Sequence, residues 1–458
     1  MRSTPIPQPF LNWMGVWPGQ AGSDESGRAF LQDPPRGIRL RLQQARKSEV
    51  ILRPPRPWER SILSHLTILL EGGRYRMWYF EKRPPENPTR YAESDDGYNW
   101  EFPELGLYDL DGSTANNALF GSDYFMIHSL FRDPTAEPPE RYKAIERQKG
   151  DEILFGAVSP DGLRWTRKEE PLLVVGKPLD TQNIAAFDED TGEYLAFLRG
   201  GYERRRSVTR TGGPAFGNWH APRYVMTIDG QDVVDEDLYT NCYCRSPGSR
   251  RHLMFPTIYH RLSSTLDVQL ATSIDGWLWE RPVRQPIITR EADDEEYGAI
   301  YACPNLVPVG DDWGVMCHAV YQRHDGGGRH LSAEERPKSE YRWALWEPDR
   351  LMALEAPDEG GFTTTERDCA GVDLRLNYRT RIGGWMRAAL VEKPRTGGGR
   401  VPAAELEGFG TADCDVLEGD ELSRVVSWKG RSDLSKFAGR EVCVRFTMAR
   451  AELFSVAV

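Results

Sequence analysis

The chain has 458 residues, and its 58 lysines and arginines against 69 aspartates and glutamates give a formal net charge of −11. This acidic balance argues against a nucleic-acid-binding protein and against a polybasic membrane-surface protein, because both need a positive face. The 43 glycines, 32 prolines, 14 tryptophans, 18 tyrosines and 17 phenylalanines favour a fold rich in strands and turns over a helical bundle.

Two further features indicate where the protein works. The N-terminal segment lacks the apolar core of a secretory signal, and no run is long and apolar enough to span a membrane. The seven cysteines include no Cys-x-x-Cys pair, which predicts reduced and buried thiols. We therefore expect a cytoplasmic protein with no membrane partner.

The first 50 residues are rich in proline and arginine and are expected to form an irregular N-terminal arm. An edge strand at 39–43 is the one regular element expected there.

A turn motif recurs after the arm. Three heptapeptides share the pattern Ser-x-Asp-Gly-x-x-Trp and begin at Ser94, Ser159 and Ser273, and a degenerate fourth copy ends at Trp219. Asp-Gly favours a tight hairpin because glycine adopts positive φ readily, and the serine and aspartate can bond to the turn's backbone. The four tryptophans are 65, 54 and 60 residues apart, and such a period indicates a β-propeller. We interpret the motif as structural.

Alternating apolar strands accompany these turns. Five of them are expected at 75–80, 142–146, 194–199, 252–256 and 313–320. Five units of about four strands predict a five-bladed β-propeller over residues 51–355. Short β runs at 371–378, 386–392, 425–428, 442–448 and 453–458 predict an antiparallel β-sandwich over residues 356–458. The predicted fold class is all-β.

One segment resembles a known family. Phe131-Arg132-Asp133-Pro134, followed by Tyr142-Lys143-Ala144-Ile145, resembles the Arg-Asp-Pro region of the five-bladed propeller glycoside hydrolases. These are the invertase and levansucrase group and the arabinanase group (families 32, 68 and 43). The resemblance extends over roughly residues 50–458. It implies hydrolysis of a glycosidic bond by paired carboxylates in a central pocket.

The resemblance suggests three catalytic carboxylates. Asp133 would contact sugar hydroxyls and stabilise the transition state, although Asp-Pro also simply terminates strands. Glu59 is the one acid in the expected inner segment of blade 1, where the family's Asn-Asp-Pro-Asn-Gly is missing. Asp180 is the nearest acid in blade 3, where the family has a glutamate.

Candidate sugar-binding residues follow the same pattern. Trp58 would stack on a sugar, Arg132 would pair with a carboxylate or sugar, and the amides of Asn117, Gln182 and Asn183 would bond to hydroxyls. Asp237 and Glu296 belong to acidic runs that open blades 4 and 5, for which a solvated loop is the alternative.

We expect a carbohydrate substrate and neither a cofactor, a metal ion nor a nucleic-acid partner. His318, His324 and His330 are six residues apart, which is not a metal-binding spacing. The incomplete motifs of blades 1 and 3 leave a second hypothesis open, a carbohydrate-binding propeller without catalysis. Two carboxylates facing each other across an axial pocket would favour the hydrolase.

Overall fold

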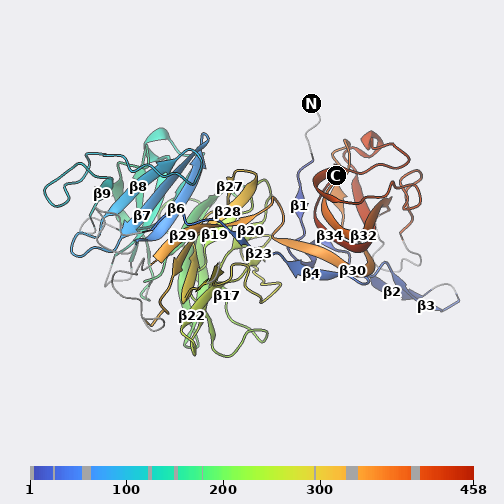
Figure 1. Cartoon of the computed structure of the whole chain (residues 1–458), viewed down its shortest axis with the longest axis horizontal. Helices are drawn as coiled ribbons and strands as arrows, with labels where there is room; N and C mark the ends of the chain where they lie inside the picture. The colour runs from blue at the N-terminus through green and yellow to red at the C-terminus, as the bar shows by residue number, and fades with distance from the viewer. Residues whose placement is uncertain are drawn as a thin grey trace. The chain divides into compact units, whose positions relative to one another are not determined.

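The computed structural model describes residues 5–23, 26–53, 63–121, 126–148, 153–177, 179–292, 295–325, 339–392 and 403–458. The chain divides into two compact units, one of residues 44–345 and one of residues 1–43 with 346–458. Regular structure in the described residues is β-strand apart from three short 3-10 helices, Trp13–Gly15, Pro138–Glu140 and Ser435–Phe437 (Figure 1). The predicted all-β class is confirmed. No helix of the described ranges is long and apolar enough to cross a membrane.

The larger unit begins with three four-stranded antiparallel sheets, each a meander in chain order. Their strands are β6 (Leu63–Glu71), β7 (Arg74–Glu81), β8 (Thr89–Ser94) and β9 (Ala118–Phe120); β10 (Ile127–Arg132), β11 (Tyr142–Gln148), β12 (Ile153–Ser159) and β13 (Thr166–Val174); β14 (Ile184–Asp188), β15 (Glu193–Tyr202), β16 (Arg205–Gly213) and β17 (Arg223–Met226). The first strand β10 packs against both β6 and β14, so the sheets follow one another as blades in a propeller-like arrangement.

The rest of the larger unit departs from the predicted pattern. A three-stranded sheet forms a fourth blade from β19 (Tyr243–Arg245), β20 (His252–Met254) and β23 (Ala271–Ser273). An eight-stranded sheet contains β18 (Glu236–Leu238), β21 (Thr257–His260), β22 (Thr265–Val268), β26 (Ala299–Ala302), β27 (Val307–Val309), β28 (Asp312–Val320), β29 (Ser339–Trp346) and β5 (Arg46–Lys47). A short ribbon pairs β24 (Glu291–Ala292) with β25 (Glu295–Glu296).

The prediction of five separate blades is therefore wrong for the described residues, which form four. The physical reason is one parallel contact, in which Leu266 of β22 lies opposite Ala299 of β26. This pairing joins strands expected in blade 4 to strands expected in blade 5. The five individual strands expected from the sequence are nevertheless present as β7, β11, β15, β20 and β28.

The recurring turn connects neighbouring sheets. In the second sheet, Asp161 Oδ1 accepts hydrogen bonds from two backbone N–H groups at 2.8 Å, and Ser159 Oγ accepts one from Gly162. The Gly162 carbonyl then accepts two indole N–H groups, from Trp165 of its own turn at 2.9 Å and from Trp78 of the first sheet at 2.7 Å. The structural interpretation of the motif is confirmed.

The same arrangement joins the last strands to the first sheet. The Gly97 carbonyl accepts the indole N–H of Trp100 at 3.1 Å and that of Trp343 on β29 at 2.9 Å. Nearby, Asn305 Nδ2 donates to the carbonyl of Ile68 on β6 at 2.8 Å. These contacts bring the end of the larger unit back to its beginning.

Substitution of Gly162 tests the turn. Gly162 has φ +78°, and an added Cβ would lie 2.8 Å from a ring carbon of Trp78. Gly73, with φ +83° in the β6–β7 hairpin, has nothing within 4 Å of such a Cβ. Both Gly→Ala variants should lose about 1–2 kcal/mol from the left-handed backbone. Gly162→Ala should lose a further ~1–3 kcal/mol from overpacking, measured by urea unfolding. Equal losses in the two variants would show that the Trp78 contact contributes nothing.

The smaller unit contains a seven-stranded sheet and a separate hairpin. Its strands are β1 (Gln8–Pro9), β2 (Gln20–Ser23), β3 (Ala29–Gln32), β4 (Arg39–Leu42), β30 (Met352–Thr363), β31 (Arg367–Asp368), β32 (Arg375–Val391), β33 (Asp420–Val425) and β34 (Glu441–Ala457). The main order is β33-β32-β34-β30-β4, with β1 and β31 also paired to β34. The expected edge strand at 39–43 is present as β4, and residues 1–43 belong to this unit because β1 and β4 pair with strands that follow residue 346.

The short strands expected here are parts of longer ones. Strands β32 and β34 each run for 17 residues and curve in Figure 1. Register shifts occur between Asn377 and Tyr378 and between Thr380 and Trp385, where bulges bend the ladder. The sequence showed two β runs on either side of each bend, whereas the backbone pairing continues through it. Buried side chains that include Leu376, Met386, Trp428 and Phe446 form the core of this unit.

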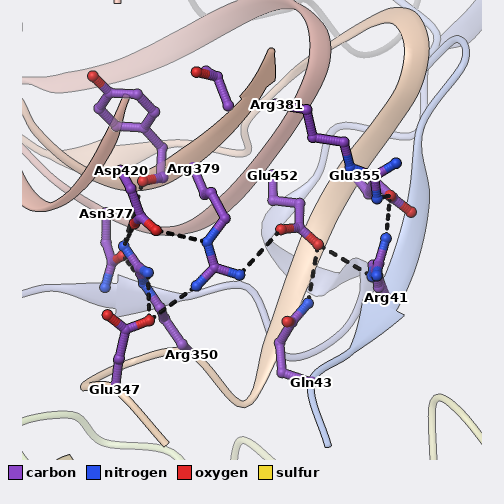
Figure 2. A network of polar contacts seen from close by, with 12 residues as sticks. Arg41, Gln43, Glu347, Arg350, Glu355, Asn377, Arg379, Arg381, Asp420 and Glu452 are labelled. Atoms are coloured by element: carbon purple, nitrogen blue, oxygen red, sulfur yellow. Dashed lines mark hydrogen bonds and ion pairs between the residues drawn. The ribbon is translucent and has the colours of Figure 1, made fainter. Parts of the chain in front are cut away.

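A network of ion pairs holds β4 at the edge of the sheet (Figure 2). The Glu355 carboxylate, only 1% exposed, accepts hydrogen bonds from Arg39 at 2.7 Å, Arg41 at 2.5 Å and Arg381 at 2.6 Å. Burial alone would raise the pKa of Glu355, but Arg39 and Arg41 hold it below its ordinary value. Three strands are thus tied together by one ionised carboxylate.

We predict that Glu355→Gln lowers the thermal midpoint of unfolding at pH 7, because three arginines lose the negative charge of Glu355. Since the folded-state pKa is depressed, the wild-type advantage is present above the unfolded pKa and fades as the pH falls through the folded one. The difference between wild type and variant should therefore shrink below pH ~4. Glu359→Gln, at an exposed position on the same strand, is the matched control. A difference that is independent of pH would contradict the ionic explanation.

Candidate functional site

A cavity of about 490 Å³ lies where several sheets of the larger unit meet. It is lined by the start of β6, the segments 180–182 and 239–240, strands β26 and β28, and residues 322–324. Because the lining comes from segments far apart in the chain, only the closed arrangement of sheets creates this space. Its place among first strands corresponds to the axial pocket of a propeller.

Aromatic rings form one wall of the cavity. Tyr239 lies with its ring centroid 6.0 Å from Tyr301 and 4.7 Å from His324. The Tyr301 hydroxyl is 3.3 Å from His324 Nδ1. Burial, and after it the neighbouring Tyr239, raises the pKa of Tyr301, so its hydroxyl is neutral and available as a donor. This wall combines flat apolar faces with polar tips.

Two histidines on the cavity surface are neutral at pH 7. Burial lowers the pKa of His65 to about 4, with a smaller contribution from Arg147. Burial also lowers the pKa of His318 to about 4, with His65 adding to the effect. His65 Nδ1 is 3.0 Å from Ser64 Oγ, whereas the Nε2 atoms of both rings are buried without a hydrogen-bond partner. Both rings are therefore uncharged parts of the cavity wall, and their Nε2 atoms are covered by protein atoms in this structure.

Asp180 is the one carboxylate among the described residues that line the cavity. Its side chain is 58% exposed and forms an ion pair with Arg199 of β15. Gln182 also lines the cavity, and its Nε2 donates to the carbonyls of Leu66 at 3.0 Å and His128 at 3.1 Å. Those two bonds fix the Gln182 side chain across β6 and β10. The structure thus brings Asp180 and Gln182 to one site.

Asn183, in contrast, is buried and fully engaged. Its Nδ2 donates to the carbonyls of Leu179 and Thr181, and its Oδ1 accepts from the backbone N–H of Arg199 at 2.9 Å. A side chain with these partners supports the loop that carries Asp180. Asn183 therefore has a structural place in the fold, where the sequence suggested sugar binding.

Asp133 does not line the cavity. It follows β10, and its fully buried carboxylate accepts hydrogen bonds from Tyr194 at 2.5 Å and Thr135 at 2.7 Å and pairs with Lys143 at 3.2 Å. Burial opposes ionisation, but these bonds hold the pKa of Asp133 below its ordinary value. The Arg-Asp-Pro motif thus places this carboxylate between β11 and β15, where it joins two sheets, and this corrects the expected central position.

The other expected binding residues also lie outside the cavity. Asn117 is buried and bonded to Tyr79 and Arg90. Arg132 is half exposed beside Glu71 at 3.9 Å. The remaining two are engaged in ion pairs, Asp237 with Arg261 and Glu296 with Arg290. Each of these polar groups interacts with nearby residues of the fold. Glu59 and Trp58 lie outside the described residues, so their proposed roles stay predictions.

The sequence analysis missed most of the cavity surface. Tyr239 stands two residues after the acidic run that was considered for its carboxylates, and Tyr301 belongs to a strand without any motif. His318 and His324 were considered only for a metal ion, and His65 gave no signal. Their common property is an inward position on strands or loops from different sheets, which no local pattern specifies.

Comparisons with known proteins give limited similarity. No family model matches the chain. Two uncharacterized proteins of Mycobacterium tuberculosis strains are 27% identical over 154 residues, which covers 31% of this chain and 48% of theirs. The chain thus matches about half the length of these curated relatives.

Similar solved structures include a glycoside hydrolase, with a TM-score of 0.47 at 13% identity over 67% of this chain and 93% of that chain. They also include an α-L-arabinofuranosidase of Podospora anserina in complex with cellotriose, with a TM-score of 0.44 at 13% identity over 67% and 98%. Similarities of this size carry neither the activity nor the ligands of those proteins to this chain.

The place of Asp133 changes the expected effect of its substitution. Asp133→Asn removes the negative charge beside Lys143, whose side chain is 2% exposed, and should destabilise the fold by about 3 kcal/mol in urea unfolding. Asp311→Asn, at an exposed position of the same unit, should change stability by less than ~0.5 kcal/mol. Unchanged stability of Asp133→Asn together with a loss of turnover would restore the catalytic interpretation.

Proposed function

We propose that the protein binds a carbohydrate in the axial cavity and hydrolyses a glycosidic bond there. The observation that carries this proposal is the composition of the cavity surface, in which the rings of Tyr239 and Tyr301 occur together with amide, hydroxyl, imidazole and carboxylate groups. Aromatic faces pack against the C–H faces of sugar rings, and the polar groups match sugar hydroxyls.

The neutral histidines fit this ligand. An uncharged imidazole has one donor and one acceptor nitrogen, and the lowered pKa of His65 and His318 keeps both rings in that state at neutral pH. The rigid Gln182 side chain supplies a carbonyl oxygen whose orientation is set by the two bonds of its amide. These groups would orient a sugar ring by hydrogen bonds.

Hydrolysis needs a general acid and a second carboxylate that acts as nucleophile or base. Asp180 is our candidate for one of them, because its carboxylate reaches the cavity. Glu59 is our candidate for the other on the sequence argument alone. The separation of the two groups would then distinguish retention at about 5–5.5 Å from inversion at about 6.5–9.5 Å.

A second candidate function is carbohydrate binding without catalysis. It is favoured by the ion pair between Asp180 and Arg199, which engages the single described cavity carboxylate. In this case Asp180 and Arg199 would bond to sugar hydroxyls, and turnover would be absent.

Calorimetric binding and product analysis with a panel of plant and bacterial oligosaccharides test both functions. If the hydrolase proposal holds, Asp180→Asn should lower kcat by about 10²–10⁴-fold while the substrate still binds. Asp311→Asn should leave both quantities unchanged. Binding by the wild type without any product would favour the second function. Failure of every sugar to bind would overturn both.

A further inference from the structure

Positively charged side chains line the cavity of this acidic protein. Lys82 and Arg323 line it, and neither has an ion-pair partner in the part of the chain that the structure describes. Both residues are exposed, so their charges are in contact with solvent where they line the cavity. In a protein with a net charge of −11, two cations without an ion-pair partner among the described residues thus line the same cavity.

A third cation lies behind the aromatic wall. The guanidinium of Arg206 stands 4.2 Å from the ring centroid of Tyr239, and its buried Nη1 atom has no hydrogen-bond partner. Its field reaches the cavity surface, because after burial Arg206 is the next cause of the lowered pKa of His324. The nearby carboxylate of Asp237 is itself bonded to Arg261.

Negative groups around the cavity do not balance these charges. Asp180 is engaged by Arg199. Asp325 follows His324 and raises the pKa of that histidine, whereas Arg206 lowers it, and the effect of Asp325 is the smaller of the two. The histidines add no negative charge. The described surroundings of the cavity are therefore positive, and a concave site with apolar walls concentrates such a field.

We propose that the ligand of this cavity is an anionic saccharide, one that carries a carboxylate of the uronic-acid type. This inference rests on the proposed carbohydrate binding and specifies its substrate class. The sugar ring would pack on Tyr239 and Tyr301, and its carboxylate would face the Lys82 and Arg323 side of the opening. A guanidinium and an ammonium provide charge-assisted hydrogen bonds for such a group.

The test compares matched sugars by calorimetry. The probes are oligosaccharides of galacturonic acid and of glucuronic acid, each beside the neutral galactose or glucose oligosaccharide of the same length and linkage. The acidic member of a pair should bind at least about tenfold more tightly at low salt. Raising the salt to 0.5 M should remove most of this preference, because exposed charges are screened.

Variants identify the groups that read the charge. Lys82→Gln and Arg323→Gln should each weaken binding of the acidic sugar several-fold and leave the neutral sugar unaffected. Arg206→Gln should do the same, and Arg206→Lys should restore part of the preference because it keeps the charge. Arg223→Gln, at an exposed position on the outer strand β17, is the control and should change neither. The thermal midpoint of each variant is compared with wild type to confirm folding.

The outcomes separate this inference from the proposal beneath it. Equal binding of acidic and neutral sugars, or a preference that survives the Lys82, Arg206 and Arg323 substitutions, would overturn the charge inference and leave carbohydrate binding intact. Failure of both kinds of sugar to bind would overturn the two together.

Discussion

The carbonyl of a turn glycine that accepts two indole N–H groups is the contact on which the larger unit depends. One indole belongs to the turn itself and the other to the neighbouring sheet, as with Trp165 and Trp78 at Gly162. The serine and aspartate of the motif satisfy the turn's own N–H groups, which leaves the carbonyl oriented toward the next sheet. At these positions the turn is thus both a hairpin and a connector. The repetition of this contact at Gly97 carries the same restraint from β29 to the first sheet.

This restraint also explains why the cavity exists. Sheets held side by side at their turns bring first strands and inter-sheet loops toward a common centre, and the space between them is lined by whatever those segments present. Many polar groups in and around these segments are already used to hold the sheets together. Asp133 and Asn183 are examples, since every hydrogen bond found for them supports a neighbouring strand or loop. The polar groups available to a ligand are those that do not make such bonds within the fold.

The two units use charge in different ways. In the smaller unit, Glu355 forms ion pairs with three arginines, and these pairs hold β4 to the sheet. At the cavity of the larger unit, Lys82 and Arg323 have no counter-charge among the described residues. Removing one partner of a buried ion pair destabilises a fold, whereas charges left unpaired in a concave site are suited to a ligand.

Local patterns in the sequence determined the all-β class, the structural role of the turns, the five strands between residues 75 and 320 and the edge strand at 39–43. Each of these depends on neighbours in the chain: Asp-Gly sets a turn, and apolar alternation sets a strand. Only the tertiary structure decided that β22 pairs with β26 in place of a fifth separate blade, and that β32 and β34 continue through bends. It also decided that Asp180 and Gln182 share a cavity with Tyr239 and Tyr301. Asp133, in contrast, is bonded to Lys143 and Tyr194 outside that cavity. These outcomes depend on contacts between residues far apart in the sequence. A local sequence pattern does not specify which residues make such contacts.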